Sequence, residues 1–406
     1  MAGPETLLGL DIGTTKVAAV IGGRGAEVRI LGAASVPCTG LRRGSVVDVA
    51  ETTRAVREAV TKAQRTAGVE LAPAWVGVTG QHISCLNARG EIQLARANRE
   101  IAWGDVERVM AASVSAVSIP SDRQMIHAVS RGFMVDGEPR VRNPIGLSAN
   151  RLAVETHVVT ASRNLVENLV RCVEQAGCNV AELVAEPLAT ADAVLSEEEQ
   201  ELGVLLIDVG GGTTDIALFA EGSIAYTGAI PAAGSNVTHD LAVALGITHP
   251  QAEQIKLAHG CARVSEVPEE QLVAIPHERT VSRRFVAEVI EARVQEIFRL
   301  VAQEMERSGT KWPPPGGAVL TGGSSLLPAI ASVAQEALAC RARLGRPRVA
   351  SGPLHLLESP SLATGLGLVY YAQREAESRR AEPRPTVRVL PILGRMIAWV
   401  KDLFSS

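Results

Sequence analysis

The residues best suited to chemistry in this chain lie in stretches where an apolar strand ends in an aspartate and a glycine-threonine turn follows. One is residues 205–218, LLIDVGGGTTDIAL, in which Asp208 precedes three glycines. Consecutive glycines let backbone amides approach a phosphate with no side chain in the way, and threonine hydroxyls add further donors. The residues predicted to contact phosphate here are Gly210, Gly211, Gly212, Thr213 and Thr214.

Two carboxylates flank this turn, Asp208 and Asp215. Magnesium prefers carboxylates together with waters that it retains, so both can hold the waters around a magnesium ion, and Asp208 is assigned to the magnesium site. Taken alone, the stretch favours phosphate binding only modestly, because ordinary β-hairpins also use glycine-rich turns.

The same design occurs about two hundred residues earlier, in residues 7–16, LLGLDIGTTK. Its strand ends at Asp11, a second expected magnesium residue, and a second strand is predicted after the turn. A third motif, AVLTGGSSLL at 318–327, is a strand, a glycine-serine turn and the start of an apolar helix. The residues predicted to bind phosphate or nucleoside in these two motifs are Gly13, Thr14, Thr15, Lys16, Gly322, Gly323 and Ser324.

Three such motifs in this order resemble the actin/Hsp70/hexokinase superfamily of ATP-binding α/β folds, in which two related halves surround a nucleotide cleft. The resemblance implies ATP and Mg²⁺ as cofactors. It makes Glu186, in the first turn of a helix, a candidate magnesium residue, although a glutamate favoured there by the helix dipole is an equal alternative. By the same resemblance Gly234, Ser235, Glu253 and Lys256 are expected near the nucleotide, but a solvated charge is the favoured interpretation of Lys256.

Composition limits the other function classes. A chain of 406 residues is too long for one ordinary core, and 46% hydrophobic with 21% charged residues is typical of a globular protein. The formal net charge of -4 gives no support for a nucleic-acid partner. Six scattered cysteines without a CxxC pair fit reduced thiols in a cytoplasm.

The chain also lacks the pattern of a signal peptide, and no stretch reaches the roughly 20 apolar residues that a spanning helix needs. Motifs for metalloprotease, Ser-hydrolase and P-loop chemistry, HExxH, GxSxG and GxxxxGK[ST], are absent from the sequence.

The end of the chain predicts a separate element. Residues 373–388 are charged and contain proline, which is typical of a flexible linker, and residues 389–404 have helical apolar periodicity. A tail helix packed on the body is the common alternative, but a long polar linker and large apolar residues favour an interfacial membrane helix. Its predicted membrane-binding residues are Ile392, Leu393, Met396, Ile397, Trp399, Val400, Leu403 and Phe404.

These features together resemble the FtsA family, on the motifs LGLDIGTTK, IDVGGGTTDIA, SRRFVAEVIEAR and LTGGSSLL and the terminal helix. The resemblance implies a peripheral protein at the division site, on the cytoplasmic face of the cell membrane. Its implied partners are FtsZ, further copies of itself, membrane lipids and other division proteins, with no nucleic acid. Residues 84–160 would be a small α/β insertion that supports polymer contacts; the alternative is that they continue the first core.

The expected domains follow from this resemblance. They are 5–83 with 161–200 as the first half-domain core, 84–160 as the insertion, 201–244 with 311–372 as the second half-domain core, 245–310 as the FtsZ-binding subdomain, 373–388 as the linker and 389–406 as the membrane-targeting amphipathic helix.

Hydrolysis of ATP needs a group that positions the attacking water, and Hsp70-like relatives take a catalytic lysine from a subdomain that FtsA-like chains lack. No residue here clearly replaces it, so the catalytic group is unassigned and at most slow ATP hydrolysis is expected. A small-molecule kinase of the same fold, with Asp215 as its base, is an alternative function. A pilus-assembly scaffold of the PilM type is another, against which the terminal amphipathic helix argues.

Overall fold

A computed structural model describes residues 6–25, 27–95, 98–276, 278–348 and 358–381. Its contacts divide the chain into two compact units. One comprises the described residues within 6–84 and 164–373, and the other comprises the described residues within 85–163 and 374–381.

The first sheet of the larger unit has the order β13-β6-β1-β2-β3. Strand β1 pairs antiparallel with β2 and parallel with β6, and both β1 and β2 are buried along nearly their whole length, as in sheets covered on both faces. Helix α1 (Val49–Ala67) packs on β2 and β3. The strands are β1 (Thr6–Ile12), β2 (Lys16–Gly23), β3 (Arg29–Pro37), β6 (Ala74–Val78) and β13 (Val180–Ala185), with a small hairpin β4 (Leu41–Arg42) and β5 (Ser45–Val46) before α1.

The second sheet repeats this plan with the order β16-β15-β14-β19-β20. Strand β14 pairs antiparallel with β15 and parallel with β19, so β14 corresponds to β1. The strands are β14 (Val204–Val209), β15 (Thr214–Ala220), β16 (Ser223–Ile230), β19 (Ala318–Thr321) and β20 (Ala342–Leu344). Two halves with one strand order confirm the predicted actin-like α/β architecture of related half-domains.

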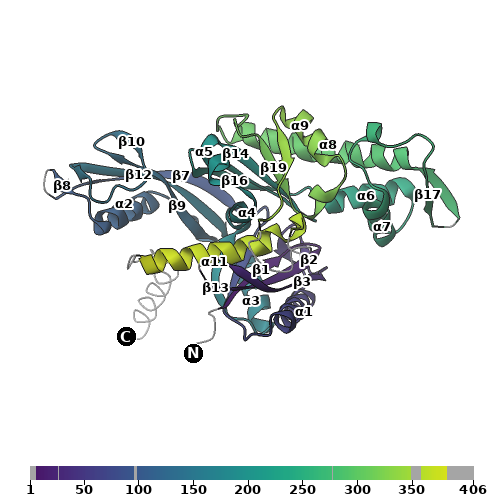
Figure 1. The fold of residues 1–406 in the computed structure, drawn as a ribbon, viewed down its shortest axis with the longest axis horizontal. Coiled ribbons are helices and arrows are strands. Elements are labelled where there is room, and N and C mark those ends of the chain that lie inside the picture. The colour runs from purple at the N-terminus through teal and green to yellow at the C-terminus, as the bar shows by residue number, and fades with distance from the viewer. Residues whose placement is uncertain (1–5, 26, 96–97, 277, 349–357, 382–406) are drawn as a thin grey trace. The chain divides into compact units, whose positions relative to one another are not determined.

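A helical layer belongs to the second half. Helix α6 packs against both α7 and α8 (Figure 1). The long helix α8 buries one apolar face, which includes Phe298 and Met305. The elements of this part are α5 (Glu197–Leu202), α6 (Gly234–Leu245), α7 (His249–His259), η1 (Val264–Glu266), β17 (Leu272–Ile275), β18 (Arg279–Ser282), α8 (Arg283–Arg307), η2 (Gly323–Leu326) and α9 (Ile330–Leu338).

The smaller unit is built on a four-stranded sheet with the order β10-β9-β12-β7 and one helix, α2, packed on β12. Its core gathers around Val109, Phe133 and Leu152. The elements are β7 (Ser84–Gln93), β8 (Arg99–Glu100), α2 (Trp103–Ser115), β9 (Arg123–Val135), β10 (Glu138–Val141), β11 (Ser148–Ala149) and β12 (Arg151–Ser162). The chain then returns to the larger unit with α3 (Arg163–Gln175).

Two helices, α4 (Glu186–Val194) and α11 (Ala363–Ala381), cross at glycine. A Cβ at Gly367 would overlap the backbone of Ala189, so no larger residue fits at the crossing. A short turn, η3 (Pro360–Leu362), precedes α11. Because α11 continues to Ala381, residues 373–381 are helical, and the prediction of a flexible linker is wrong for them; residues 382–388 lie outside the described residues.

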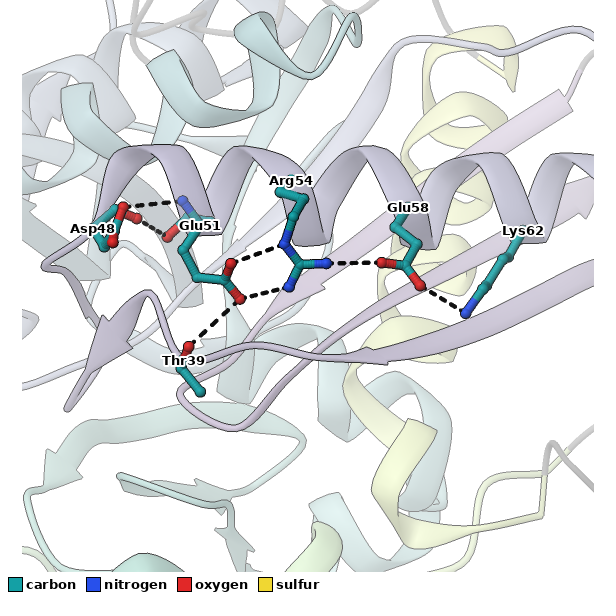
Figure 2. Close-up of polar contacts among 7 residues, drawn as sticks. Thr39, Asp48, Glu51, Arg54, Glu58 and Lys62 are labelled. Atoms are coloured by element: carbon teal, nitrogen blue, oxygen red, sulfur yellow. Dashed lines mark hydrogen bonds and ion pairs between the residues drawn. The ribbon is translucent and has the colours of Figure 1, made fainter.

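The exposed face of α1 carries a ladder of ion pairs (Figure 2). Asp48 accepts a hydrogen bond from the Glu51 amide and caps the start of the helix, a position where aspartate is favoured. Arg54 then bridges Glu51 and Glu58, at 2.7 and 2.9 Å. Each pair joins residues three or four apart, the spacing that places side chains on one helical face.

Candidate functional site

The two predicted hairpins form the centre of the site and close in the same way. In the β1–β2 hairpin the Gly13 amide donates to the Lys16 carbonyl at 2.9 Å. In the β14–β15 hairpin the Gly210 amide donates to the Thr213 carbonyl at 3.0 Å. The repeated sequence pattern therefore gives a repeated turn.

The two turns lie directly against each other. A Cβ added at Gly211 would overlap the side chain of Thr15, and one added at Gly212 would overlap that of Thr14. Only glycine permits this approach, because any side chain would push the hairpins apart. The first hairpin thus presents hydroxyls and the second presents bare backbone, which is the donor set that phosphate groups require.

Both predicted hydroxyl donors of the second hairpin, Thr213 and Thr214, are engaged within their own half. The Thr214 hydroxyl donates to the backbone oxygen of Ala232 at 2.7 Å and is fully buried. The Thr213 hydroxyl instead donates to the Asp215 carboxylate at 3.3 Å. In this structure neither side chain presents a free hydroxyl to the facing hairpin.

Four buried carboxyl groups lie behind the turns: Asp11, Glu186, Asp208 and Asp215. Asp208 Oδ2 accepts hydrogen bonds from Thr364 at 2.9 Å and Thr190 at 3.4 Å, one from each crossing helix. These two hydroxyls are 3.0 Å apart. Asp208 therefore ties the second hairpin to both α4 and α11.

Burial raises the pKa of all four groups, and repulsion by neighbouring carboxylates adds to the rise at Asp208, Asp215 and Glu186. Burial, with the neighbouring Asp11, raises the pKa of Asp208 to about 6, while the Thr364 hydroxyl opposes the shift. Burial raises the pKa of Asp215 to about 7 against the opposing Thr79 hydroxyl, and Asp208 adds to the rise. Burial also raises the pKa of Asp11, with Lys16 acting in the opposite direction.

The same causes act most strongly on Glu186, whose pKa burial and the three aspartates raise well above its usual value. Among the described residues, its Oε1 atom has no hydrogen-bond partner. The side chain lies over Gly77 of β6, where a Cβ would come within 2.9 Å of it. Buried carboxylates are normally paired with a cation or bound to a metal, so this cluster and its unsatisfied oxygen fit a cation bound between the carboxyl groups.

The cluster is not a preformed direct-ligand site. Within the described ranges, no group of three His, Cys, Asp or Glu side chains is placed to hold a metal ion. A magnesium ion there would be held through water by Asp11, Asp208 and Glu186, which is a common way for proteins to bind it. The donor chemistry therefore fits magnesium held through water.

The third motif and the start of α6 join the second hairpin. The amides of Gly234 and Ser235 donate to the carbonyls of Gly210 and Gly211, at 3.1 and 2.7 Å. The Ser324 hydroxyl also donates to the Gly210 carbonyl, at 2.8 Å.

The surrounding elements differ slightly from those expected. The sequence pattern predicts a helix over residues 237–245, but helix α6 begins earlier, at Gly234. Gly322 packs against Asp208, and Gly323 opens the turn η2. Helix α9 follows only from Ile330, later than the apolar helix start predicted after the motif.

Lys256 of α7 corrects the sequence-based interpretation. It is 7% exposed, so it is not the solvated charge that was favoured. Its Nζ donates to the Thr238 hydroxyl at 2.8 Å and to the Gly234 carbonyl at 3.3 Å, and it pairs with Glu253 at 2.7 Å. Both residues thus adjoin the start of α6 and, through it, the phosphate turn.

Four polar contacts of the site were not foreseen. They come from Thr79, Thr190 and Thr364, whose hydroxyls bind the buried aspartates, and from Ser361, whose carbonyl accepts from Lys16 Nζ. Thr190 lies in the helix that the sequence predicts to begin at Glu186. Thr364 lies in LATGLGL, whose small residues are typical of a closely packed crossing helix. The two crossing helices were therefore the available signal. Thr79 had no such signal: the sequence predicts it only as the last residue of a strand over 74–79.

The eight predicted membrane-binding residues, from Ile392 to Phe404, lie outside the described residues. Within the part of the chain that is described, no helix has the length and apolarity needed to cross a membrane.

Known proteins identify the family. A family model described as cell division protein FtsA matches residues 205–367, and one described as an SHS2 domain inserted in FtsA matches residues 80–160. The FtsA of Pseudomonas aeruginosa is 37% identical over 416 residues, covering 98% of each chain. The chain belongs to the FtsA family of cell division proteins. FtsA of Bacillus subtilis is 35% identical, with 92% of this chain and 84% of the relative covered, and that of Escherichia coli K12 is 33% identical, with 98% of each covered.

Solved structures share the fold of this FtsA-family chain. A PilM–PilN type IV pilus biogenesis complex matches with a TM-score of 0.65 and 17% identity, over 90% of this chain and 98% of the other. MreB5 of Spiroplasma citri bound to ADP matches with a TM-score of 0.55 and 15% identity, over 93% and 99%. These likenesses confirm the actin-like ATPase fold alone.

Proposed function

We propose that this chain is an ATP-binding, actin-like division protein that polymerises on the inner face of the cell membrane. There it anchors the FtsZ ring, with its C-terminal amphipathic helix as the membrane attachment. The observation that carries the nucleotide part is the apposition of the two hairpins, Thr14 and Thr15 against Gly212 and Gly211, over buried carboxylates.

In this proposal the site holds Mg-ATP between its halves. The hairpins bind the phosphates, and Asp11, Asp208 and Glu186 hold magnesium waters. Gly322, Gly323 and Ser324 line the nucleoside side, while Glu253 and Lys256 support it through the start of α6. Support for a nucleotide comes from the actin-like fold, since MreB5 of the same fold binds ADP. ATP then acts chiefly as a ligand that shifts the conformational and assembly equilibrium, with slow hydrolysis.

The membrane part rests on the periodicity of residues 389–404. One short amphipathic helix binds lipid weakly and reversibly, so firm attachment needs several copies side by side, and polymerisation would supply them. In this scheme residues 84–160 make polymer contacts and residues 245–310 bind FtsZ. A small-molecule kinase would not need such a terminal helix. Membership of the FtsA family favours a division protein over a pilus-assembly scaffold of the PilM type.

Co-sedimentation with anionic vesicles tests the proposal. The full chain is compared with one that ends at Ala381, which retains all of α11, each with and without ATP and FtsZ. We expect only the full chain to pellet and to carry FtsZ down with it. A full-length Leu393→Glu variant should stay in solution, while the polar-face control Asp402→Ala should pellet. Equal sedimentation of the truncated and full chains would exclude attachment through residues 382–406.

A further inference from the structure

Thr79 makes a side-chain hydrogen bond between the two half-domains at the nucleotide cleft. It lies one residue beyond β6 of the first half, and its hydroxyl donates to Oδ1 of Asp215 on β15 of the second half. Both residues are buried, at 7% and 5% exposure. The contact joins residues 136 positions apart.

The main chain at Thr79 is held on two sides. Strand β6 pairs in parallel with β1 and with β13, up to the pair Val78–Ala185. The tip of the β4–β5 hairpin closes the other side: a Cβ at Gly44 would lie 2.7 Å from the Thr79 carbonyl oxygen. Arg43, at this tip, takes a φ of 51°, a left-handed conformation that costs free energy in a residue other than glycine. The hydroxyl of Thr79 is therefore presented from a fixed backbone.

Asp215 differs from its cross-strand partner Asp208 in what it does. Asp208 is engaged by hydroxyls from both crossing helices and lies against Gly322. Asp215 is engaged by the first half through Thr79 and by its own turn through Thr213. Asp208 thus connects the two crossing helices, while Asp215 lies at the junction of the two halves, beside the phosphate turns.

Resting on the proposed ATP site, we propose that Asp215 orients the water that attacks the γ-phosphate and that Thr79 is the positioning residue that aims Asp215. The Asp215 carboxylate accepts a hydrogen bond from this water. The water oxygen forms a bond to the γ-phosphorus as the bond from that phosphorus to the bridging oxygen of ADP breaks. One water proton stays on the new P–OH group, the other passes to a γ-phosphate oxygen, and ADP leaves with the bridging oxygen.

A hydroxyl deletion in the intact chain tests this role. Thr79→Val removes the hydroxyl at nearly constant volume, and Thr79→Ser keeps it. Thr52→Val is the matched control: Thr52 is fully buried, and its hydroxyl donates to the Asp48 carbonyl at 2.7 Å, away from the site. The rate constant of hydrolysis and KM are measured for each from the dependence of the rate on ATP concentration, with Asp215→Asn as reference.

We expect Thr79→Val to lower the rate constant of hydrolysis about tenfold to hundredfold with KM unchanged within about twofold, because the lost interaction orients the reacting water. Thr79→Ser should restore the rate to within about threefold, Asp215→Asn should lose at least as much as Thr79→Val, and Thr52→Val should hydrolyse like the unmodified chain. Should Thr79→Val not fold, Thr79→Ala replaces it with the same expectation.

Three results would overturn the inference: a rise in KM without a fall in rate, a Thr79→Ser rate as low as that of Thr79→Val, or an unmodified chain no faster than Asp215→Asn. The proposed function fails differently. A chain that binds no ATP at all, or a full chain that does not pellet with vesicles, contradicts the division-protein proposal whatever the variants do.

Discussion

The two phosphate hairpins share one sequence pattern and one turn geometry, yet they contribute different chemistry. The β1–β2 hairpin offers side chains, the hydroxyls of Thr14 and Thr15 and the ammonium of Lys16. The β14–β15 hairpin offers backbone, since Gly211 and Gly212 leave no room for a Cβ against the facing threonines. A repeated motif therefore becomes a complementary pair: the side chains of one half fill the space that the glycines of the other leave.

The aspartates behind the hairpins differ in the same way. Asp11 has a cation on its own hairpin, Lys16, which lowers its pKa against the effect of burial. Asp208 has neutral hydroxyls from Thr190 and Thr364, supplied by the crossing helices. The charge of Asp11 is therefore stabilised from within its own hairpin, whereas the charge of Asp208 is stabilised by hydroxyls from other elements.

The largest effect that would break this complementarity is expected at Gly211. Gly211→Ala places a methyl group inside the Thr15 side chain, so we expect ATP affinity to fall at least about a hundredfold, or about 3 kcal/mol. In the first hairpin, a Cβ at Gly13 would lie 3.2 Å from the Lys16 carbonyl and 3.8 Å from Asp11 Oδ1, with no overlap of a side chain, so Gly13→Ala should lose about tenfold or less. Titration calorimetry with ATP checks both values.

A compensating change sharpens this test. Adding Thr15→Ala to Gly211→Ala removes the side chain that the new methyl group would overlap, and part of the lost affinity should return. Equal losses in Gly211→Ala and Gly13→Ala would show instead that the hairpins contribute alike.

The second effect is a pH dependence of stability that should be larger for Asp208 than for Asp11. The pKa of Asp208 is about 6 in the folded chain and near 3.8 when unfolded, so the folded state binds more protons between these values. The free energy of unfolding of the nucleotide-free chain must then fall as the pH rises from about 4 to about 7. A shift of this size amounts to about 3 kcal/mol.

Replacement of the carboxyl group removes this penalty. Asp208→Asn should flatten the fall, whereas Asp11→Asn should change it less, since Lys16 already favours the charged form of Asp11. Urea denaturation at pH 5 and pH 8 measures the difference. A steeper pH dependence in Asp208→Asn would contradict the assignment.

The third effect distinguishes Lys16 of the first half from Lys256 of the second half, because one should act on ATP affinity and the other on stability. Lys256 is buried among Thr238, Glu253 and the Gly234 carbonyl, so Lys256→Met should lower the free energy of unfolding by about 2 kcal/mol. Lys16→Met should act mainly on ATP affinity, because Lys16 belongs to the phosphate turn. Thermal unfolding and calorimetry on both variants test this, and a Lys256→Met chain as stable as the original would contradict it.

The sequence predicted well what local patterns determine. The two hairpins and the strand and glycine-serine turn of the third motif are confirmed by the structure. These features depend on turn residues, caps and apolar runs within about twenty residues. The same local rules placed Glu186 at the start of a helix, because the next residue, Pro187, favours the first turn of a helix.

Features that depend on distant partners were not predictable in this way. Thr79 and Thr364 bind aspartates 136 and 156 residues away, and no spacing in the sequence indicates such a pairing. Lys256 looked solvated because only the folded chain brings Thr238 and Glu253 around it. Residues 373–381 looked like a linker by charge, yet their Gln, Arg, Glu and Ala residues favour helix, and α11 extends through them.

The smallest effect is expected at the ladder on α1, which resembles the site in its density of charges and differs from it in burial. Arg54 has 55% of its side chain exposed and bridges two partly exposed glutamates (Figure 2). Exposed pairs gain little because water and salt screen them. Arg54→Ala should therefore shift the Tm by no more than about 2 °C and leave ATP affinity unchanged. Calorimetry at low and high salt checks this: a large shift that persists at high salt would mean that this face, like the buried aspartates, stabilises the fold.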